Sequence, residues 1–345
     1  MVPESLNERE RRVLEAIVQN YVQSAEPVGS RTIARRFGLG VSAATIRNAM
    51  SDLEDKGYLY HPHTSAGRVP TDRAYRLSVD ALMHQPRVSA REREALRDQR
   101  ATQGTAVTEI LRRAAEVLGV LTQELGIAVA PSLGDIVLER LDLVAVASDR
   151  LLLVLTLKSG IVRTIFVHVP GSLRPDALAA VTVVLNERLS GLSLREIRQG
   201  LGDRLRDSGA TPAQTELLDI FIATGEQIFD VADDGAPVLL GHTSVLAEQP
   251  EFATGEKMRA LIELTEQRDV LRHVLGERAQ TGSVTITIGG ENATEQLANL
   301  TLVTSPYRLG PLNGVIGVLG PTRMPYEKVV ALVEHTSKMV GELLR

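Results

Sequence analysis

The first 60 residues repeat a pattern in which apolar side chains recur every three or four positions, between loops that contain glycine or proline. Residues 5–8 fit a capping box, and the apolar positions that follow predict a helix that ends before Pro27. Ser30 is predicted to cap a second, short helix, and Ser42 a third helix that ends near Gly57. The inward stripe predicted for the third helix consists of Ile46, Ala49, Met50 and Leu53.

The segment after the third helix predicts a β-hairpin. Residues 58–60 and 68–70 fit two short strands, and the loop between them is polar and contains a glycine. Two helices joined by a glycine-containing turn, with a hairpin appended, are typical of a winged helix-turn-helix, which we assign to residues 1–83. Three-helix modules also mediate protein contacts, so a protein-binding module with a solvated basic face stays open as an alternative.

The outer face of the third helix carries side-chain types that suit DNA. Arginine can donate two hydrogen bonds to guanine, asparagine can pair with adenine, and serine or threonine can reach a base or a phosphate. We therefore predict that Thr45, Arg47 and Asn48 contact bases. The side chains predicted to contact mostly phosphates, or to lie on the same face, are Arg31, Ser42, Ser51, His63, Ser65 and Arg68.

Charge is distributed unevenly along the chain, which changes what the net charge implies. The 345 residues carry a formal net charge of −5, which argues against a general nucleic-acid coat protein. Residues 1–75, however, contain ten basic and nine acidic side chains, so the other 270 residues carry a net charge of −6. The arginines of residues 27–51, a stretch without any acidic residue, are Arg31, Arg35, Arg36 and Arg47. We expect one basic, DNA-reading face on an otherwise acidic chain.

Beyond residue 83, the apolar pattern alternates between helical and strand-like segments. Residues 84–104 are charged and poor in apolar positions, which predicts a linker or an exposed helix. The helix predicted over residues 107–125 has an apolar seam too short for a coiled coil, so we expect it to pack on its own domain. Strands are predicted over residues 141–146, 151–157 and 161–169, as an antiparallel meander, and over residues 283–288, 300–304 and 314–319. Further helices are predicted to start at Pro175, Ser193 and Thr211, and to span about 255–275 and 326–344.

This order of elements predicts an α+β multidomain chain. Strands, a helical block and then strands again indicate a mixed α/β domain with an antiparallel sheet, which we place over residues 105–189 and 281–345. A mostly helical insertion over residues 190–280 is expected to interrupt that domain.

The composition excludes several classes of function. The chain has no cysteine, which rules out disulfide bonds, thiolate catalysis and cysteine-ligated zinc or iron–sulfur clusters. Only 3% of the residues are aromatic, which argues against a stacking platform for single-stranded nucleic acid. The first residues form no apolar signal core, and the longest apolar runs are too short to cross a membrane, so we expect a cytoplasmic protein.

No catalytic or metal-binding constellation can be assembled from the sequence. Walker loops, nucleophile elbows and zinc-protease motifs are absent. His61 and His63 flank a proline, as a metal pair could, but they have no acidic or further histidine partner nearby, so we favour a loop or phosphate-contact role. The histidines that lack metal-ligand spacing to any partner are His168, His242, His273 and His335. Residues 289–292 and 317–324 are glycine-rich and could form a pocket in which Arg323 binds an anion. We favour the simpler interpretation that these glycines make tight turns and that Arg323 pairs with a carboxylate of the fold. We therefore predict a protein that is not an enzyme and has no cofactor and no metal.

Two sets of motifs lie at opposite ends of the chain. They are residues 27–33, 42–54, 57–59 and 62–71 near the start, and residues 288–292, 305–307 and 314–324 near the end. Together they resemble the HrcA family, the heat-inducible transcription repressors of bacteria. The resemblance implies a GAF-like domain with an inserted dimerising domain. It also implies a homodimer that binds the CIRCE inverted repeat upstream of chaperone operons (GroEL–GroES and DnaK) and is modulated by the GroEL chaperonin.

Two other classes of function stay open from the residues themselves. One is a metabolite-sensing winged-helix regulator with a ligand in the GAF-like domain, although analogy of fold does not establish a ligand. The other is an enzyme or an adaptor that uses the N-terminal module for protein contacts.

Overall fold

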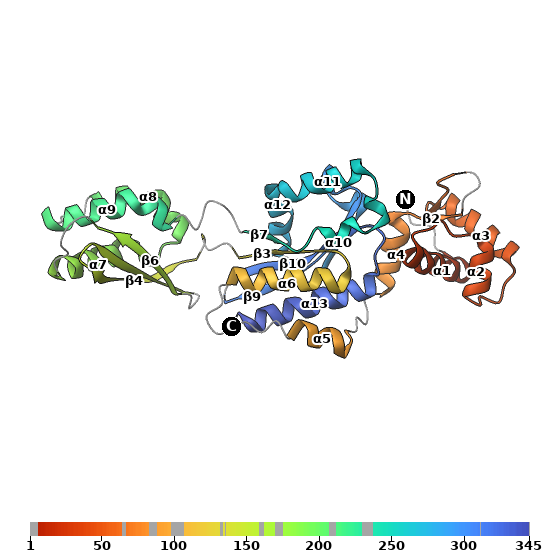
Figure 1. The fold of residues 1–345 in the computed structure, drawn as a ribbon, viewed down its shortest axis with the longest axis horizontal. Coiled ribbons are helices and arrows are strands. Elements are labelled where there is room, and N and C mark those ends of the chain that lie inside the picture. Colours follow the sequence, from red (N-terminus) through yellow and green to blue (C-terminus); the bar gives the residue numbers. More distant parts are fainter. Residues whose placement is uncertain are drawn as a thin grey trace. The chain divides into compact units, whose positions relative to one another are not determined.

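The chain divides into two compact units, one inserted into the other (Figure 1). The computed structural model describes residues 6–63, 67–82, 88–97, 107–131, 134, 136–158, 162–169, 175–206, 212–229, 237–310 and 312–344. The first unit comprises Met1–Ala128, Val238–Tyr307 and Val315–Leu343, and the second comprises Val129–Pro237, Arg308–Gly314 and Leu344–Arg345.

The N-terminal module of the first unit consists of four helices and a short hairpin. Its elements are α1 (Glu8–Ser24), α2 (Ser30–Arg36), α3 (Ala43–Asp55), β1 (Leu59–Tyr60), β2 (Val69–Pro70) and α4 (Asp72–Leu82). The two strands are antiparallel, with Leu59 opposite Pro70. The side chains buried between the first three helices include Val13, Ile17, Ile33, Ile46, Met50 and Leu53. The three predicted helices, the hairpin and the inward stripe of the third helix are therefore confirmed.

Two helix starts differ from the prediction. The Asn7 side chain accepts a hydrogen bond from the Glu10 backbone, and the Glu10 carboxylate accepts one from the Asn7 backbone, both at 2.9 Å. The capping box of α1 is thus formed by these two residues, and the predicted cap Ser5 lies outside the described residues. Ser30 is the first residue of α2 and is buried, while Gly29 occupies the capping position. Neighbouring polar residues can exchange this role, so the sequence places a helix start only to within a residue or two.

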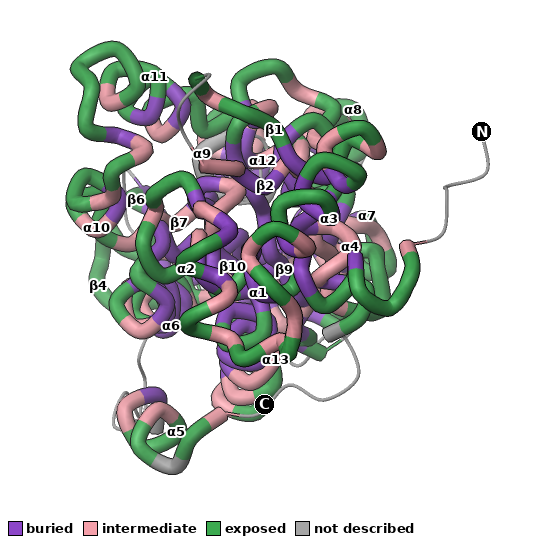
Figure 2. The backbone as a smooth tube through the Cα atoms, turned by 90° about the vertical axis from the view of Figure 1, so that its right-hand side faces the viewer, coloured by how far each residue is buried: buried purple, intermediate pink, exposed green. Residues whose placement is uncertain are grey.

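The body of the first unit is built on a five-stranded sheet in the order β7-β3-β10-β9-β8. Its strands are β3 (Leu125–Val129), β7 (Val238–Leu240), β8 (Thr285–Ile288), β9 (Leu300–Leu309) and β10 (Leu312–Pro321). Its helices are α5 (Ala90–Arg97), α6 (Val107–Thr122), α10 (Ser244–Ala247), α11 (Gly255–Glu266), α12 (Arg268–Arg278) and α13 (Tyr326–Leu343), with the 3₁₀ turns η2 (Pro250–Phe252), η3 (Gly289–Glu291) and η4 (Glu295–Leu297). Helix α6 lies alongside α13 (Figure 1), and most of β9 and β10 is buried (Figure 2).

The second unit packs three helices against a three-stranded antiparallel sheet in the order β4-β5-β6. Its elements are β4 (Leu138–Ala147), β5 (Arg150–Leu157), β6 (Val162–His168), α7 (Pro175–Leu189), α8 (Leu194–Arg206) and α9 (Pro212–Phe229). The core between sheet and helices includes Leu151, Leu153, Leu155, Leu185, Ile197 and Phe221. Every second residue of β5 faces this core, so the residues between them lie on the opposite face of the sheet.

The boundaries of the insertion differ from the predicted ones. The predicted meander is present, but it belongs with α7–α9 to the inserted unit. Helices α11 and α12, which the prediction placed in the insertion, belong to the body. Strands β3 and β7, which border the insertion, are absent from the predicted set. An apolar pattern identifies a strand without naming the strand that it pairs with, so the prediction joined two separate sheets into one.

Two smaller differences concern helices. The single helix predicted over residues 255–275 is two helices, α11 and α12, which meet at Gln267 with φ −78° and ψ 62°. No glycine or proline in the sequence marks this break. Residues 84–104 are predicted to form a linker or an exposed helix, and the described residues 88–97 do contain a helix, α5, but its Leu96 is buried.

Glu124 is a buried carboxyl group between α6 and β3. It is 2% exposed, and its Oε2 accepts a hydrogen bond from Gln249 Nε2 at 3.1 Å. Burial raises the pKa of Glu124 well above the ordinary value, by more than the hydrogen bond from Gln249 lowers it. The folded chain therefore holds this proton more tightly than the unfolded chain. As the pH rises from the ordinary pKa of 4.5 through the raised pKa of the folded state, the stabilisation that this proton provides is lost.

We predict that Glu124→Gln raises the free energy of unfolding relative to wild type by an amount that grows as the pH rises above the ordinary pKa of 4.5. The amide keeps the shape of the side chain and still accepts the hydrogen bond, but it carries no charge that burial penalises. Urea unfolding at several pH values measures the difference, with Glu187→Gln on the exposed surface of α7 as the control. A difference that stays constant over this range contradicts the account.

Candidate nucleic-acid interface

The first turn of α3 is fixed by its cap and by a glycine turn. The Ser42 hydroxyl accepts a hydrogen bond from the Thr45 backbone at 3.1 Å, and the two side-chain hydroxyls lie 2.9 Å apart. Ser42 is thus the predicted cap, in an extended backbone conformation. Gly38 and Gly40 have φ angles of +54° and +72°, which side chains disfavour, so the turn between α2 and α3 requires glycine at both positions. The positive end of the α3 dipole lies at this cap, one turn before Arg47.

The outer face of α3 presents a group of polar side chains. Arg47, Asn48 and Ser51 are exposed, on the side of the helix opposite its buried stripe, and Thr45 is half-buried at the edge of that face. Side chains three or four positions apart on a helix are neighbours, so these residues form one surface. Among the described residues, neither Arg47 nor Asn48 makes a hydrogen bond or an ion pair, and the same is true of Arg31 on α2.

The predicted contacts in the hairpin are placed less uniformly. His63 is exposed at the edge of the loop, and Ser65 lies outside the described residues. The side chain of Arg68 is only 15% exposed, and its Nη2 lies 2.7 Å from Oε2 of Glu54 on α3. His61 Nδ1 lies 2.6 Å from the other oxygen of the same carboxylate. Arg68 therefore ties the hairpin to α3, and a phosphate contact by this side chain would compete with that ion pair.

The hairpin is also fixed to the loop before α2. The backbones of Val28 and Arg68 exchange two hydrogen bonds, at 2.8 and 2.9 Å. A Cβ atom at Gly67 would lie 2.5 Å from the Val28 backbone, so only glycine permits this approach. The hairpin thus has a defined position relative to both α2 and α3.

The far end of α3 is held against α1 by an ion pair. Lys56 Nζ lies 3.0 and 2.9 Å from the two carboxylate oxygens of Glu10, which is 4% exposed. Burial raises the pKa of Glu10, but the hydrogen bonds from Lys56 and from the Asn7 backbone outweigh it, so its pKa lies below the ordinary value. Arg73 donates to the Lys56 carbonyl (2.8 Å), and its guanidinium lies 4.5 Å from the centre of the Tyr58 ring. Lys56 and Arg73 therefore stabilise the module internally.

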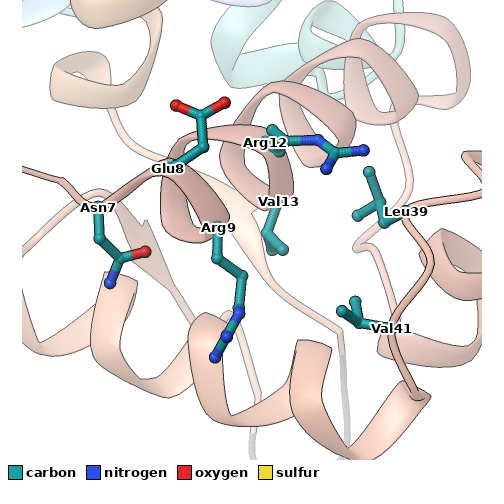
Figure 3. A pocket seen from close by; sticks show the side chains of 7 residues that line it. All are labelled: Asn7, Glu8, Arg9, Arg12, Val13, Leu39 and Val41. Atoms are coloured by element: carbon teal, nitrogen blue, oxygen red, sulfur yellow. The ribbon is translucent and has the colours of Figure 1, made fainter.

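A hollow beside the start of α3 contains two arginines to which no sequence motif points. It measures about 440 Å³ and is lined by Asn7, Glu8, Arg9, Arg12, Val13, Leu39 and Val41 (Figure 3). Arg9 and Arg12 are exposed residues of α1, and Figure 3 shows the Arg12 side chain extending toward Leu39 in the turn before α3. Their proximity to α3 depends on the packing of α1 against that turn, which local sequence patterns do not reveal.

The other residues that the sequence suggests for a ligand pocket make contacts within the fold. Arg323 pairs with Glu251, as predicted, with Nε 2.5 Å from Oε1. Residues 289–291 form the tight 3₁₀ turn η3 beside β8. Within the described ranges, no group of three or more acidic or histidine side chains is placed to hold a metal ion. None of the helices described is both long enough and apolar enough to cross a membrane.

Comparisons with known proteins agree with the motifs at both ends of the chain. Residues 108–330 match the family model described as the HrcA protein C-terminal domain. The chain is 39% identical over 342 residues to the heat-inducible transcription repressor HrcA of Chlorobium phaeovibrioides, which covers 96% of this chain and 95% of the relative. It is 37% identical over 343 residues to the protein of the same name in Geobacter sulfurreducens, covering 98% of each. A crystal structure described only as that of a hypothetical protein shares the fold, with a TM-score of 0.68, 23% identity and 99% of both chains covered. The chain belongs to the HrcA family.

Proposed function

We propose that this protein is a heat-inducible transcription repressor that recognises its operator through the outer face of α3. The observation that carries the proposal is the pair Arg47 and Asn48, exposed and unengaged on a helix whose opposite face is buried. These are the side-chain types that hydrogen-bond to guanine and adenine edges in the major groove, which is wide enough to admit an α-helix. The names of the relatives support a regulatory, non-enzymatic role and do not favour the metabolite-sensing alternative.

The N-terminal module is, in this proposal, a winged helix-turn-helix with α3 as the recognition helix, and the body is the GAF-like domain. The hairpin directly after α3 supports the assignment, because the Arg68–Glu54 ion pair fixes it as a wing beside that helix. Thr45, Arg47 and Asn48 contact bases. The proposed phosphate contacts are Arg31, Ser42, Ser51, His63 and Ser65, together with Arg9 and Arg12 from the hollow beside α3. Arg68 acts mainly by positioning the wing.

The proposed repressor acts as a homodimer on a two-fold operator. One winged helix reads only a few base pairs, so selecting one site in a genome requires two modules. The inserted unit offers a surface for self-association, because Val144, Leu152 and Phe166 form one row across the open face of its sheet, where Phe166 is 64% exposed. Arg140 and Asp142, on β4 beside this row, form an ion pair with each other at 2.7 Å.

The family resemblance suggests the operator and the regulator. The operator is the CIRCE inverted repeat upstream of the GroEL–GroES and DnaK operons, and the regulator is the chaperonin GroEL. Free GroEL helps the repressor reach its active fold in the cytoplasm. Heat-unfolded clients then occupy GroEL, the amount of active repressor falls and the chaperone genes are expressed. Such a switch requires marginal stability, because only then does a modest loss of folding deplete the active dimer.

We expect Arg47→Ala to weaken binding to the inverted repeat by about 1–3 kcal/mol, because it removes two hydrogen bonds to a base. Gel-shift titrations against the repeat and against a shuffled sequence measure the loss, which is smaller on the shuffled DNA. Arg112→Ala is the control, because Arg112 is a paired surface arginine of α6. The recognition role of α3 is wrong if Arg47→Ala binds the repeat as tightly as wild type. The repressor proposal itself fails if wild type does not distinguish the two DNAs.

The double substitution Arg9→Ala and Arg12→Ala is expected to reduce the salt dependence of binding. Each lost phosphate contact lowers the slope of log K against log salt concentration by about one, while the preference for the repeat over shuffled DNA persists. Arg11→Ala is the matched control, because Arg11 lies on the same helix but lines a groove against α4. Titrations at several salt concentrations check this, and an unchanged slope in the double variant removes both arginines from the interface.

A further inference from the structure

Two arginine side chains connect the N-terminal module to the body of the first unit, one contributed by each side. Arg323 follows β10 in the body, and its Nη1 donates to the carbonyl of Val22 at the end of α1, at 2.8 Å. Its remaining nitrogens are held by Glu251, with Nε 2.5 Å from Oε1 and Nη2 2.9 Å from Oε2. The hydrogen bonds that Arg323 donates to the Glu251 carboxylate raise the pKa of Arg323 above its ordinary value, so the side chain is a fixed cation.

The Val22 carbonyl is a group that α1 cannot satisfy by itself. It lies in the last turn of the helix, where carbonyl oxygens have no partner further along the chain. The last turn of α1 also contains no basic side chain, although a cation there would interact favourably with the helix dipole. Arg323 therefore supplies from the body both the hydrogen bond and the positive charge that the end of α1 lacks.

The second connection runs in the opposite direction, from α4 of the module to η3 of the body. Arg76 Nε lies 2.8 Å from Oε1 of Glu291, and Nη2 contacts Oε2 at 2.5 Å. One turn earlier, the Asp72 carboxylate accepts a hydrogen bond from the Gly290 backbone at 3.1 Å. Gly289 has φ +52°, and a Cβ atom there would lie 1.9 Å from the Asp72 carboxylate, so the contact requires glycine. The glycine-rich turn η3 thus packs against α4 and does not form a ligand pocket.

Both receiving segments of the body are themselves ordered by hydrogen bonds. The Asn292 side chain accepts from Thr287 (2.6 Å) and donates to the carbonyls of Gly289 (3.0 Å) and Leu300 (2.8 Å). Beside Glu251, the Gln249 side chain donates to the backbone carbonyl of the turn between α6 and β3, at 2.6 Å. The two arginines therefore join one rigid part to another, and bidentate pairs of this kind restrict orientation as well as distance.

We propose that Arg76 and Arg323 are positioning residues for operator binding, which set the orientation of α3 relative to the body. The buried core of the module includes neither side chain, so losing the two connections leaves the reading helix intact. The Asp72–Gly290 hydrogen bond and the packing of Tyr75 on α4 against Tyr326 on α13 then remain, and without the two bidentate pairs they restrict the orientation of the module less tightly. A module of fixed orientation accepts half-sites only at one spacing, whereas a loosely tethered module accepts several spacings at a lower effective concentration. The inference rests on the proposed repressor function.

The test compares wild type with the double variant R76Q/R323Q on three DNAs: the inverted repeat, the repeat with about five base pairs added between its arms (half a helical turn), and a single arm. Wild type is expected to prefer the native spacing strongly. The double variant is expected to lose about tenfold or more on the native repeat, to bind both spacings alike and to keep wild-type affinity for the single arm. R112Q, which breaks an exposed ion pair of α6, is the matched control and keeps the wild-type preference.

Three outcomes overturn the inference. One is a double variant that retains the wild-type spacing preference. Another is an equal loss on the single arm, which means damage to the reading helix. The double variant E251Q/E291Q removes the same two ion pairs from the acidic side. The third outcome is that this variant does not reproduce the effect of R76Q/R323Q. If wild type does not distinguish the repeat from shuffled DNA, the repressor proposal fails first.

A measurement without DNA separates the positioning role from the repressor proposal. The chain has no cysteine, so the substitutions D52C on α3 and K338C on α13 introduce the two thiols to which spin labels attach. Both positions are exposed. Diluted with unlabelled chain, wild type should give a narrow distribution of label–label distances and R76Q/R323Q a broad one. Equally narrow distributions overturn the positioning role whatever the DNA results.

Discussion

The burial of one stripe of α3 determines the direction in which all the remaining side chains of that helix point. Ile46, Ala49, Met50 and Leu53 are packed beneath it, so helical spacing turns Arg47 and Asn48 outward. Truncating a fully buried leucine costs about 2–5 kcal/mol, whereas exposed ion pairs contribute about 0–1 kcal/mol. Packing therefore orients the helix, and the polar contacts at its ends refine that orientation: the Ser42 cap at one end and the Lys56–Glu10 pair at the other.

The basic residues of the module divide into two groups according to what they contact. Arg68, Arg73 and Arg76 are committed to internal partners that fix the hairpin and α4. Arg31 and Arg47, both assigned to the proposed interface, are exposed and make no hydrogen bond or ion pair within the described part of the chain. A net charge near zero for residues 1–75 thus conceals exposed cations that are available to the proposed interface. In the proposed function, the acidic remainder of the chain repels DNA elsewhere, which favours docking through this face.

The extent to which the sequence predicts the structure depends on how local each feature is. Caps and inward stripes involve residues three or four positions apart, and so the helices and the Ser42 cap were predictable. The pairing of Arg68 with Glu54 joins residues in different elements, and the phosphate role predicted for Arg68 overlooked it. The sequence predicts that Arg323 pairs with a carboxylate of the fold, but it does not identify Glu251 or the Val22 carbonyl as the partners. Both contacts depend on how distant segments pack. The predicted insertion boundaries differ from the compact units of the structure for the same reason, since strand partners are non-local. The DNA-contact residues remain predictions, with Ser65 outside the described residues.

The central claim is that the outer face of α3 lies against operator bases, and the absence of cysteine allows a direct test. N48C introduces a single thiol at the middle of that face, and operator DNA with a thiol tethered to one base at a time can form a disulfide only with a nearby cysteine. The account predicts cross-links to bases in both arms of the inverted repeat. It predicts none with shuffled DNA and none from H273C on the exposed surface of α12. Cross-linking of N48C that is absent throughout the repeat, or no greater than that of H273C, would contradict it.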